Sequence, residues 1–388
     1  MAKKHAEGYL TAKESRRISR ENRRITSEYE KKRKRKKVDE AEYLTTMKNP
    51  ANAVEFDDLH TYFFTDAGTV KSVDGVSFEV PIGKTVGVVG ESGCGKSVTA
   101  KSIMGLIKGP QGEIKEGSEI LYNGENILKY DKKKWQAYKG GECAIIFQDA
   151  LASLNPTMRV GKQIMENLMV HKHMSKKEAA AEAVEMLRMV GIPEPEKRVK
   201  QYPHEFSGGM RQRVMIAIAF ACDPKLLICD EPTTALDVTI QGQILDIIKD
   251  LQKKHNTSVI MITHDLGVVA NIAQDIAVMY SGMIVEKGKC ADIFYKPRHP
   301  YTWALIQSVP RLDLENKQEL ASIPGTPPDL LNPPVGCPFC TRCKYCMQIC
   351  KEQMPETTDF GDGHVASCWL HHPMAPKVEM PDLKGGQR

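Results

Sequence analysis

The sequence lacks the long apolar runs of membrane-spanning proteins and the leader pattern of secreted proteins. No apolar run approaches the roughly 20 residues of a membrane span, and the N-terminus shows no signal-peptide pattern. We therefore expect the chain to stay in the cytoplasm unless a partner holds it at a membrane. At 388 residues, with 41% hydrophobic and 27% charged residues, it has the composition of a globular protein with two or three domains.

Acidic residues are scarce at the N-terminus, so the net charge of +5 is unevenly spread. Residues 1–37 hold 15 Lys and Arg but 5 Glu, a local net charge of +10, which leaves −5 for the remainder. Apolar residues are also few there, and one Ile per seven residues is too thin a stripe for a coiled coil. We expect a solvated, flexible extension, partly helical or disordered; attraction to anionic lipid or nucleic acid is the alternative.

A glycine-rich segment, Gly90–Ser97, fits the spacing G-x-x-x-x-G-K-[ST] of a phosphate-binding loop. An apolar run at 84–89 predicts a buried strand before it, and residues 98–107 predict a helix after it. Glycines let the backbone curl around a phosphate, and the helix N-terminus favours negative charge. Lys96 would reach the β- and γ-phosphates, and Ser97 would ligate Mg²⁺. The predicted ATP contacts are Gly90, Ser92, Gly93, Cys94, Gly95, Lys96, Ser97 and Val98.

Polar residues also follow other predicted strands. The apolar run 226–229 ends in Asp230 and Glu231, as a buried parallel strand does when its carboxyl end carries chemistry. We predict that Asp230 holds Mg²⁺ and that Glu231 polarises the water attacking the γ-phosphate. Gln148 follows the run 145–147 and His264 follows the predicted strand 258–262, which makes both candidates for the same site.

The segment 206–213 carries a second phosphate-binding pattern. Ser207, Gly208 and Gly209 form a turn that leads into an apolar helix predicted at 214–221, so a helix N-terminus again favours phosphate. Two such helix starts, over a hundred residues apart, are hard to explain by one nucleotide in one chain. We therefore expect two chains arranged head to tail, each closing over the ATP of the other.

Together these motifs resemble the ATPase subunits of ABC transporters over residues 54–296. Gly90–Ser97 resembles the Walker A loop, residues 226–230 the Walker B strand, and Ser207-Gly208-Gly209 the family's signature motif. The signature departs from the usual sequence in having Met210 for Gln and Phe206 for Leu. Since the Ser and both Gly are kept, we expect the phosphate contacts to survive.

The resemblance also implies roles for single residues. Glu231 matches the catalytic glutamate, and Gln148 matches the Q-loop glutamine, which senses the γ-phosphate and adds a ligand to Mg²⁺. His264 matches the switch histidine, which holds the γ-phosphate and the attacking water. Asp237 ends the segment Ala235-Leu236-Asp237, which is similar to the D-loop and contacts nucleotide in that family.

The implied fold is α/β: a RecA-like P-loop core with an antiparallel β subdomain and a helical subdomain, followed by an irregular Cys-rich extension. We divide the chain into a basic extension at 1–50, a nucleotide-binding domain at 51–296 and a C-terminal region at 297–388. Strands predicted at 54–63 and 77–80 form the antiparallel part, and a capping pattern at Ser175 supports helices within about 152–222. Phe63 or its neighbour Tyr62 is a candidate to stack on adenine, with core packing as the alternative.

Six of the eleven cysteines lie between 337 and 368, after a proline-rich stretch at 323–334. Such clustering in a cytosolic chain favours a metal site over disulfides. The segments 299–302, 323–328 and 336–339 resemble the C-terminal extension of oligopeptide/dipeptide importer ATPases, which implies a [4Fe–4S] cluster or, alternatively, zinc. The four cysteines matched are Cys337, Cys343, Cys350 and Cys368. Ferredoxin-like spacing offers a second set: Cys340, Cys343, Cys346 and Cys350.

The leading hypothesis is ATP hydrolysis that powers uptake of di- or oligopeptides, or related solutes, through a membrane ABC importer. The resemblance implies two permease subunits, a second homologous ATPase subunit in a heterodimer, an extracytoplasmic solute-binding protein, and a peripheral position at the cytoplasmic face of the membrane. One alternative is a soluble ABC ATPase acting on nucleic acid or ribosomes, against which stand a single cassette and the importer-like C-terminus; we expect no specific nucleic acid. Another is a metal or redox sensor built on the cysteines.

Overall fold

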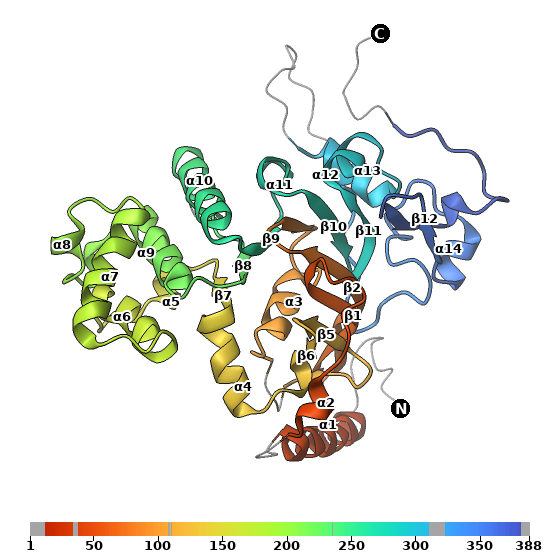
Figure 1. Cartoon of the computed structure of the whole chain (residues 1–388). Coiled ribbons are helices and arrows are strands. Elements are labelled where there is room, and N and C mark those ends of the chain that lie inside the picture. The colour runs from red at the N-terminus through yellow and green to blue at the C-terminus, as the bar shows by residue number, and fades with distance from the viewer. Residues whose placement is uncertain are drawn as a thin grey trace, which may run out of the picture.

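The computed structural model describes residues 12–33, 38–107, 109, 111–234, 236–309 and 323–381. Within these residues the larger sheet has eight strands in the order β12-β13-β11-β10-β3-β9-β8-β7 (Figure 1). The run from β10 to β7 is parallel, and β11, β13 and β12 extend it antiparallel. The strands are β3 (Thr85–Val89), β7 (Cys143–Ile146), β8 (Leu226–Asp230), β9 (Ser258–Thr263), β10 (Asp275–Tyr280), β11 (Met283–Lys289), β12 (Thr357–Asp359) and β13 (Val365–Ser367).

A smaller antiparallel sheet packs beside the parallel strands. Its order is β2-β1-β5-β6, with β4 also paired to β1. A short turn joins its first two strands, because β1 ends at Thr65 and β2 begins at Gly68. Apolar side chains of this sheet, including Phe56 and Phe78, share a core with the parallel strands and α3. The strands are β1 (Asn52–Thr65), β2 (Gly68–Pro81), β4 (Gly112–Ile114), β5 (Glu119–Tyr122) and β6 (Glu125–Asn126).

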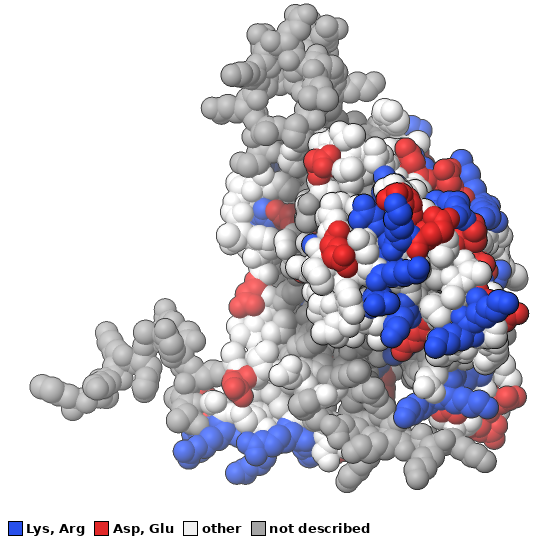
Figure 2. All heavy atoms as spheres, turned by 90° about the vertical axis from the view of Figure 1, so that its left-hand side faces the viewer, with Lys and Arg blue, Asp and Glu red and all other residues white. Residues whose placement is uncertain are grey.

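A helical lobe lies to one side of the larger sheet, shares a buried core with β7, β8 and β9, and corresponds to the predicted helical subdomain (Figure 1). Ser175 and Glu178 form the predicted capping box at the start of α7. On the outer face of this lobe Lys and Arg lie among Asp and Glu, so the face carries no single-signed basic field for nucleic acid (Figure 2). The helices of the lobe are α5 (Ala150–Ser153), α6 (Val160–His171), α7 (Lys176–Met189), α8 (Pro195–Arg198) and α9 (Gly208–Phe220).

The basic extension contains a long helix, α1 (Ala12–Arg33). It lies against the turn between β1 and β2, where Ser19 donates to Asp66 (3.2 Å) and Asn22 donates to the carbonyl of Thr65 (3.1 Å). The extension is therefore helical over these residues, while 1–11 and 34–37 lie outside the described chain. The remaining helices of the core are α2 (Glu40–Tyr43), α3 (Lys96–Ile103), α4 (Lys132–Ala137), α10 (Val238–His255), α11 (Leu266–Ile272) and α12 (Cys290–Tyr295).

The C-terminal region packs along the β10–β11 side of the core (Figure 1). It contains α13 (Pro300–Gln307), α14 (Gln348–Glu352), β12 and β13, and β13 pairs with β11. The buried carboxylate of Glu286 on β11 accepts hydrogen bonds from the backbone of His299 (2.9 Å) and contacts the ring of His364 (2.8 Å). The region is thus joined to the larger sheet by both strand pairing and a buried polar cluster.

His299 makes the attachment of the C-terminal region sensitive to acid. Its buried ring caps α13, because Nδ1 accepts from the backbone N–H of Tyr301 (3.0 Å) and must stay unprotonated to do so. Burial lowers the pKa of His299 to about 4, although the nearby Glu286 opposes the shift. Since the unfolded chain binds this proton more readily, stability is present above about pH 6.5 and is lost as the pH falls towards 4.

We expect protonation of His299 to lower the free energy of unfolding by about 3 kcal/mol by pH 4. The measurement is Tm between pH 7.5 and 4.5 for the parent and for His299→Asn, which keeps a capping acceptor but does not titrate. The Tm of the parent should fall more steeply with acid than that of the variant. Parallel curves would show that other groups carry the acid sensitivity.

Candidate ATP-binding site

The phosphate loop and three predicted site residues meet at one edge of the larger sheet. The phosphate loop follows β3, Asp230 ends β8, His264 follows β9, and Gln148 follows β7. Because these strands are parallel neighbours, their carboxyl ends lie at the same edge. Residues scattered over more than a hundred positions therefore form one site.

The phosphate loop depends on glycine for its shape. Gly90, Gly93 and Gly95 have φ angles of 155°, 80° and 105°, which side chains disfavour. A Cβ on Gly95 would also lie 2.3 Å from the carbonyl oxygen of Ser72. Helix α3 begins at Lys96, and among the described residues no side chain caps it, so its first N–H groups are available to an anion.

The loop is closed over its own lysine. Lys96 is 4% exposed, and its Nζ donates to the carbonyl oxygens of Gly90 (2.7 Å) and Glu91 (2.8 Å). Ser92, Gly93 and Cys94 line a cavity of about 300 Å³ above the loop. The side chain of Val98 packs against the core of the antiparallel sheet, and its contact with ATP stays a prediction.

A hydroxyl and a carboxylate meet beside the loop. The Oγ of Ser97 donates to Oδ1 of Asp230 (2.8 Å), although the two residues are 133 positions apart. Burial raises the pKa of Asp230 above its ordinary value, while the hydrogen bond from Ser97 opposes this. Paired hard oxygens of this kind fit Mg²⁺, whose charge would offset the cost of burying the carboxylate.

Glu231 is the centre of a second polar group. Its Oε2 accepts from Gln148 (3.2 Å) and from Thr234 (3.0 Å), and its Oε1 lies 3.3 Å from Nδ1 of His264. Its backbone has a φ of 48°, a conformation that is rare outside glycine and is often found at functional sites. Sequence reasoning missed Thr234, whose only signal is its position three residues after the carboxylate.

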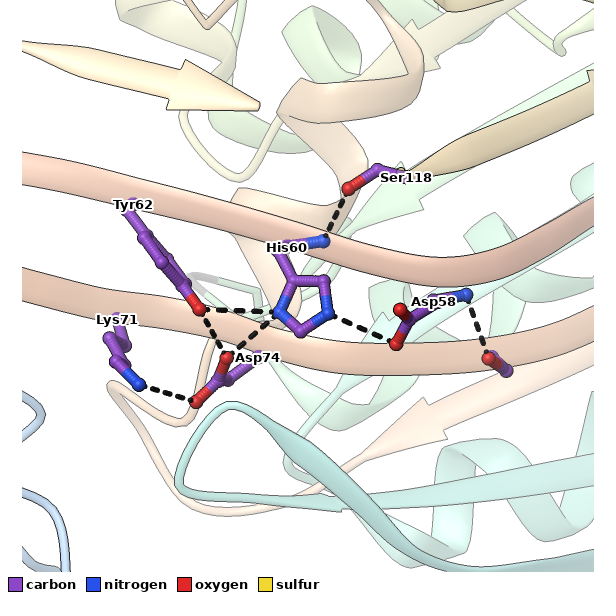
Figure 3. A network of polar contacts seen from close by, with 7 residues as sticks. Asp58, His60, Tyr62, Lys71, Asp74 and Ser118 are labelled. Carbon is purple, nitrogen blue, oxygen red and sulfur yellow. Dashed lines mark hydrogen bonds and ion pairs between the residues drawn. The ribbon is translucent and has the colours of Figure 1, made fainter. Parts of the chain in front are cut away.

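The structure separates the two aromatic candidates. Tyr62 donates to Asp74 (2.5 Å), which also contacts Nδ1 of His60 (2.8 Å) and Lys71 (3.4 Å) in a network between β1 and β2 (Figure 3). Lys71 and Asp74 flank Ser72, whose carbonyl oxygen a Cβ on Gly95 of the phosphate loop would meet. The hydroxyl of Tyr62 is therefore engaged in the scaffold.

Phe63 lies on the other face of β1, because successive side chains of a strand alternate. It pairs with Val70, which lines the cavity above the phosphate loop, and opposite residues of an antiparallel pair share a face. Its ring also packs against Gly112 of β4. Phe63 is not among the residues that line this cavity, and its stacking on adenine stays a prediction.

The signature turn lies in the helical lobe. Ser207 caps α9 by accepting from the backbone of Met210 (3.3 Å), so the helix starts at Gly208 rather than at the predicted 214. Gly209 and Asp237 line a cavity that, within the described chain, shares no lining residue with the one above the phosphate loop. Asp237 also caps α10, and Ala235 lies outside the described residues.

Comparisons with known proteins agree with this geometry. The family model "ABC transporter" matches residues 73–234, and "Oligopeptide/dipeptide transporter, C-terminal region" matches residues 285–350. The oligopeptide transport ATP-binding protein OppD of Bacillus subtilis is 56% identical over 329 residues, which cover 85% of this chain and 92% of that protein. The chain belongs to the ATP-binding subunits of oligopeptide/dipeptide ABC transporters. The dipeptide transport ATP-binding protein DppD of the same organism is 53% identical over 80% of this chain and 92% of its own length.

As a member of this family, the subunit binds ATP with Mg²⁺, hydrolyses it to drive import and works with membrane permeases at the cytoplasmic side of the membrane. The alternative of a soluble ATPase for nucleic acid or ribosomes is not supported. The dimeric ATP-binding cassette MJ0796 has the same fold, with a TM-score of 0.55 at 24% identity over 61% of this chain and 98% of that one. None of the helices that the structure describes is long and apolar enough to span a bilayer.

The predicted iron–sulfur or zinc site is wrong. Among the described residues no group of three or more His, Cys, Asp or Glu could hold a metal ion, which includes Cys337, Cys343, Cys350 and Cys368. Burial raises the pKa of Cys337 and Cys368 to about 12 and that of Cys343 to about 11. Cys337, Cys340 and Cys350 are instead buried in an apolar cluster with Phe339 and neighbouring tyrosines. The hypothesis of a metal sensor built on these cysteines is therefore not supported.

Proposed function

We propose that this subunit contributes one half to each of two ATP sites in a pair of ATPase subunits. The main support is that the phosphate loop, at residues 91–94, and the helix start at Gly208 border separate cavities. One nucleotide bound within a single chain would not account for both phosphate-binding segments. In the pair, the phosphate loop of one subunit would bind ATP and Ser207-Gly208-Gly209 of the other would close over it.

In this proposal each residue of the sheet edge has one task. The loop and the N-terminus of α3 bind the phosphates, Lys96 pairs with the β- and γ-phosphates, and Phe63 stacks on adenine. Ser97 and Asp230, with Gln148, would hold Mg²⁺, which neutralises charge on the phosphate oxygens. Glu231 accepts a proton from the attacking water. His264 orients Glu231 and the γ-phosphate, and Asp237 carries the D-loop contact between subunits.

The complete transporter would contain several further subunits besides this one. We infer two transmembrane permease subunits, a second, non-identical ATPase subunit and an extracytoplasmic solute-binding protein that selects the peptide. The support is that the chain covers 92% of OppD, which is named as an ATP-binding protein of oligopeptide transport. Pulling the tagged subunit from detergent-solubilised membranes should recover two permeases and one other ATPase in equal amounts; recovery of a lone homodimer would contradict the heterodimer.

The signature turn provides the direct test of the shared site. Ser207→Arg places a bulky cation where phosphate would approach, but it leaves the phosphate loop untouched. ATP binding by the isolated subunit should be unchanged, while ATP hydrolysis by the assembled transporter should fall about 100-fold. The measurements are equilibrium ATP binding and phosphate release.

Ser175→Arg is the matched control, since Ser175 also caps a helix of the same lobe but lies at α7. This variant should keep both activities. If Ser207→Arg instead abolished ATP binding by the isolated subunit, the turn would act within its own chain and the proposal of a shared site would fail.

A further inference from the structure

The C-terminal region reaches the phosphate loop through an ion pair between the buried Arg342 and the partly exposed Glu91. The side chain of Arg342 is 3% exposed, and its Nη1 and Nη2 donate to Oε2 (2.6 Å) and Oε1 (3.0 Å) of Glu91. Glu91 is the second residue of the phosphate loop and lies 251 positions earlier in the chain. This is the two-pronged geometry in which arginine binds carboxylate most specifically.

The guanidinium of Arg342 is held in place from the other side. Its Nε donates to the carbonyl oxygen of Pro324 (2.8 Å), and its Nη2 also donates to that of Ile323 (3.3 Å). Its Nη1 lies 3.3 Å from the hydroxyl of Tyr280 on β10. All three nitrogens of the guanidinium therefore make hydrogen bonds, so the position of the carboxylate of Glu91 is well defined.

A second contact holds the backbone of the same loop residue. The N–H of Glu91 donates to the hydroxyl of Tyr301 on α13 (2.9 Å). The carbonyl oxygen of Glu91 accepts from Lys96 (2.8 Å). Glu91 thus links two residues of the C-terminal region to the lysine that pairs with phosphate in the proposed function.

The proline-rich segment completes the contact. Its residues 327–330 form one wall of the cavity above the loop, opposite Glu91 to Cys94. The carbonyl of Leu330 accepts from the backbone of Lys71 on β2 (3.1 Å), which ties this wall to the antiparallel sheet. The phosphate loop is therefore bordered by the C-terminal region as well as by the core.

We propose that Arg342, with Tyr301, is a positioning residue for ATP: it fixes the first peptide unit of the phosphate loop in the conformation that binds nucleotide. The inference rests on the proposed function of this loop. A loop with three glycines at positive φ loses much conformational freedom when it closes around phosphate. Contacts that hold it closed beforehand remove part of this cost from binding. An ion pair of this kind, with one buried partner, adds little net stability over apolar packing.

The test uses Arg342→Met and Glu91→Gln in the full chain, singly and together. Each single variant should raise the Kd and KM for ATP about tenfold, a cost typical of one charge-assisted contact, without changing kcat at saturating ATP. The double variant should cost less than the sum of the two, because it leaves no unpaired charge. Arg342→Lys keeps the charge but loses the two-pronged geometry and should lie between parent and Arg342→Met.

The matched control is Arg298→Met, which removes a half-buried arginine of the C-terminal region that stacks on Phe360 and does not contact the loop. It should leave the KM for ATP unchanged. A merely structural role of Arg342 would lower Tm and the active fraction, and hence kcat, but not raise KM. An unchanged KM in Arg342→Met and Glu91→Gln, or an equal rise in Arg298→Met, overturns the inference. A parent chain that binds no ATP would instead overturn the proposed function.

Discussion

Glu231→Gln should leave ATP binding intact while the hydrolysis rate falls about 10²- to 10⁴-fold, the usual contribution of a general base. The amide has the shape of the carboxylate, so the contacts from Thr234 and His264 can be kept or replaced within the same space. What is lost is the ability to accept a proton from water. The measurement is equilibrium ATP binding together with single-turnover phosphate release from the assembled transporter.

A slow variant should also hold its ATP, so the pair of ATPase subunits should stay closed after ATP is added. Glu356→Gln makes the same chemical change at an exposed carboxylate of the C-terminal region and should behave as the parent. Hydrolysis by Glu231→Gln at the parent rate would mean that another group activates the water, or that this is the non-hydrolysing site of an asymmetric pair.

Much of the core was predictable because its signals are local. A short run rich in β-branched residues before the glycine loop predicts β3, and β8 and β9 are similar apolar runs that end in polar residues. Parallel order then brings Ser97 and Asp230 together without any further information. The start of α9 was placed six residues late, because Gly208 and Gly209 read as a turn whereas the cap of Ser207 lets them begin the helix.

The C-terminal region was less predictable because its contacts are distant in sequence. Nothing near Arg342 indicates a partner 251 positions away, and only the fold brings it to Glu91. The cysteine spacing predicted a metal, yet spacing alone does not distinguish thiols that converge on an ion from thiols that fill an apolar core. In this region β13 adds to the larger sheet at β11, a pairing for which the short segment 365–367 offers no pattern.

Lys96→Met should abolish useful ATP binding, with a loss of affinity of about 10- to 100-fold or more, the range expected for charge-assisted contacts to phosphate. Methionine keeps the length and apolar stem of the buried side chain but removes its charge. The measurement is the rise of Tm on adding ATP with Mg²⁺, since a ligand that binds the folded chain stabilises it in proportion to its affinity. This rise should disappear in the variant.

The Tm without ATP separates the two tasks of this lysine. Its Nζ also ties the carbonyl oxygens of Gly90 and Glu91 together, so a purely structural role would lower the ATP-free Tm and leave the ATP-induced rise. Lys84→Met, at the exposed residue just before β3, is the matched control and should keep the full rise. If Lys96→Met kept it as well, the phosphates would be held by the backbone of the loop and α3 alone, and the pairing of Lys96 with phosphate would be wrong.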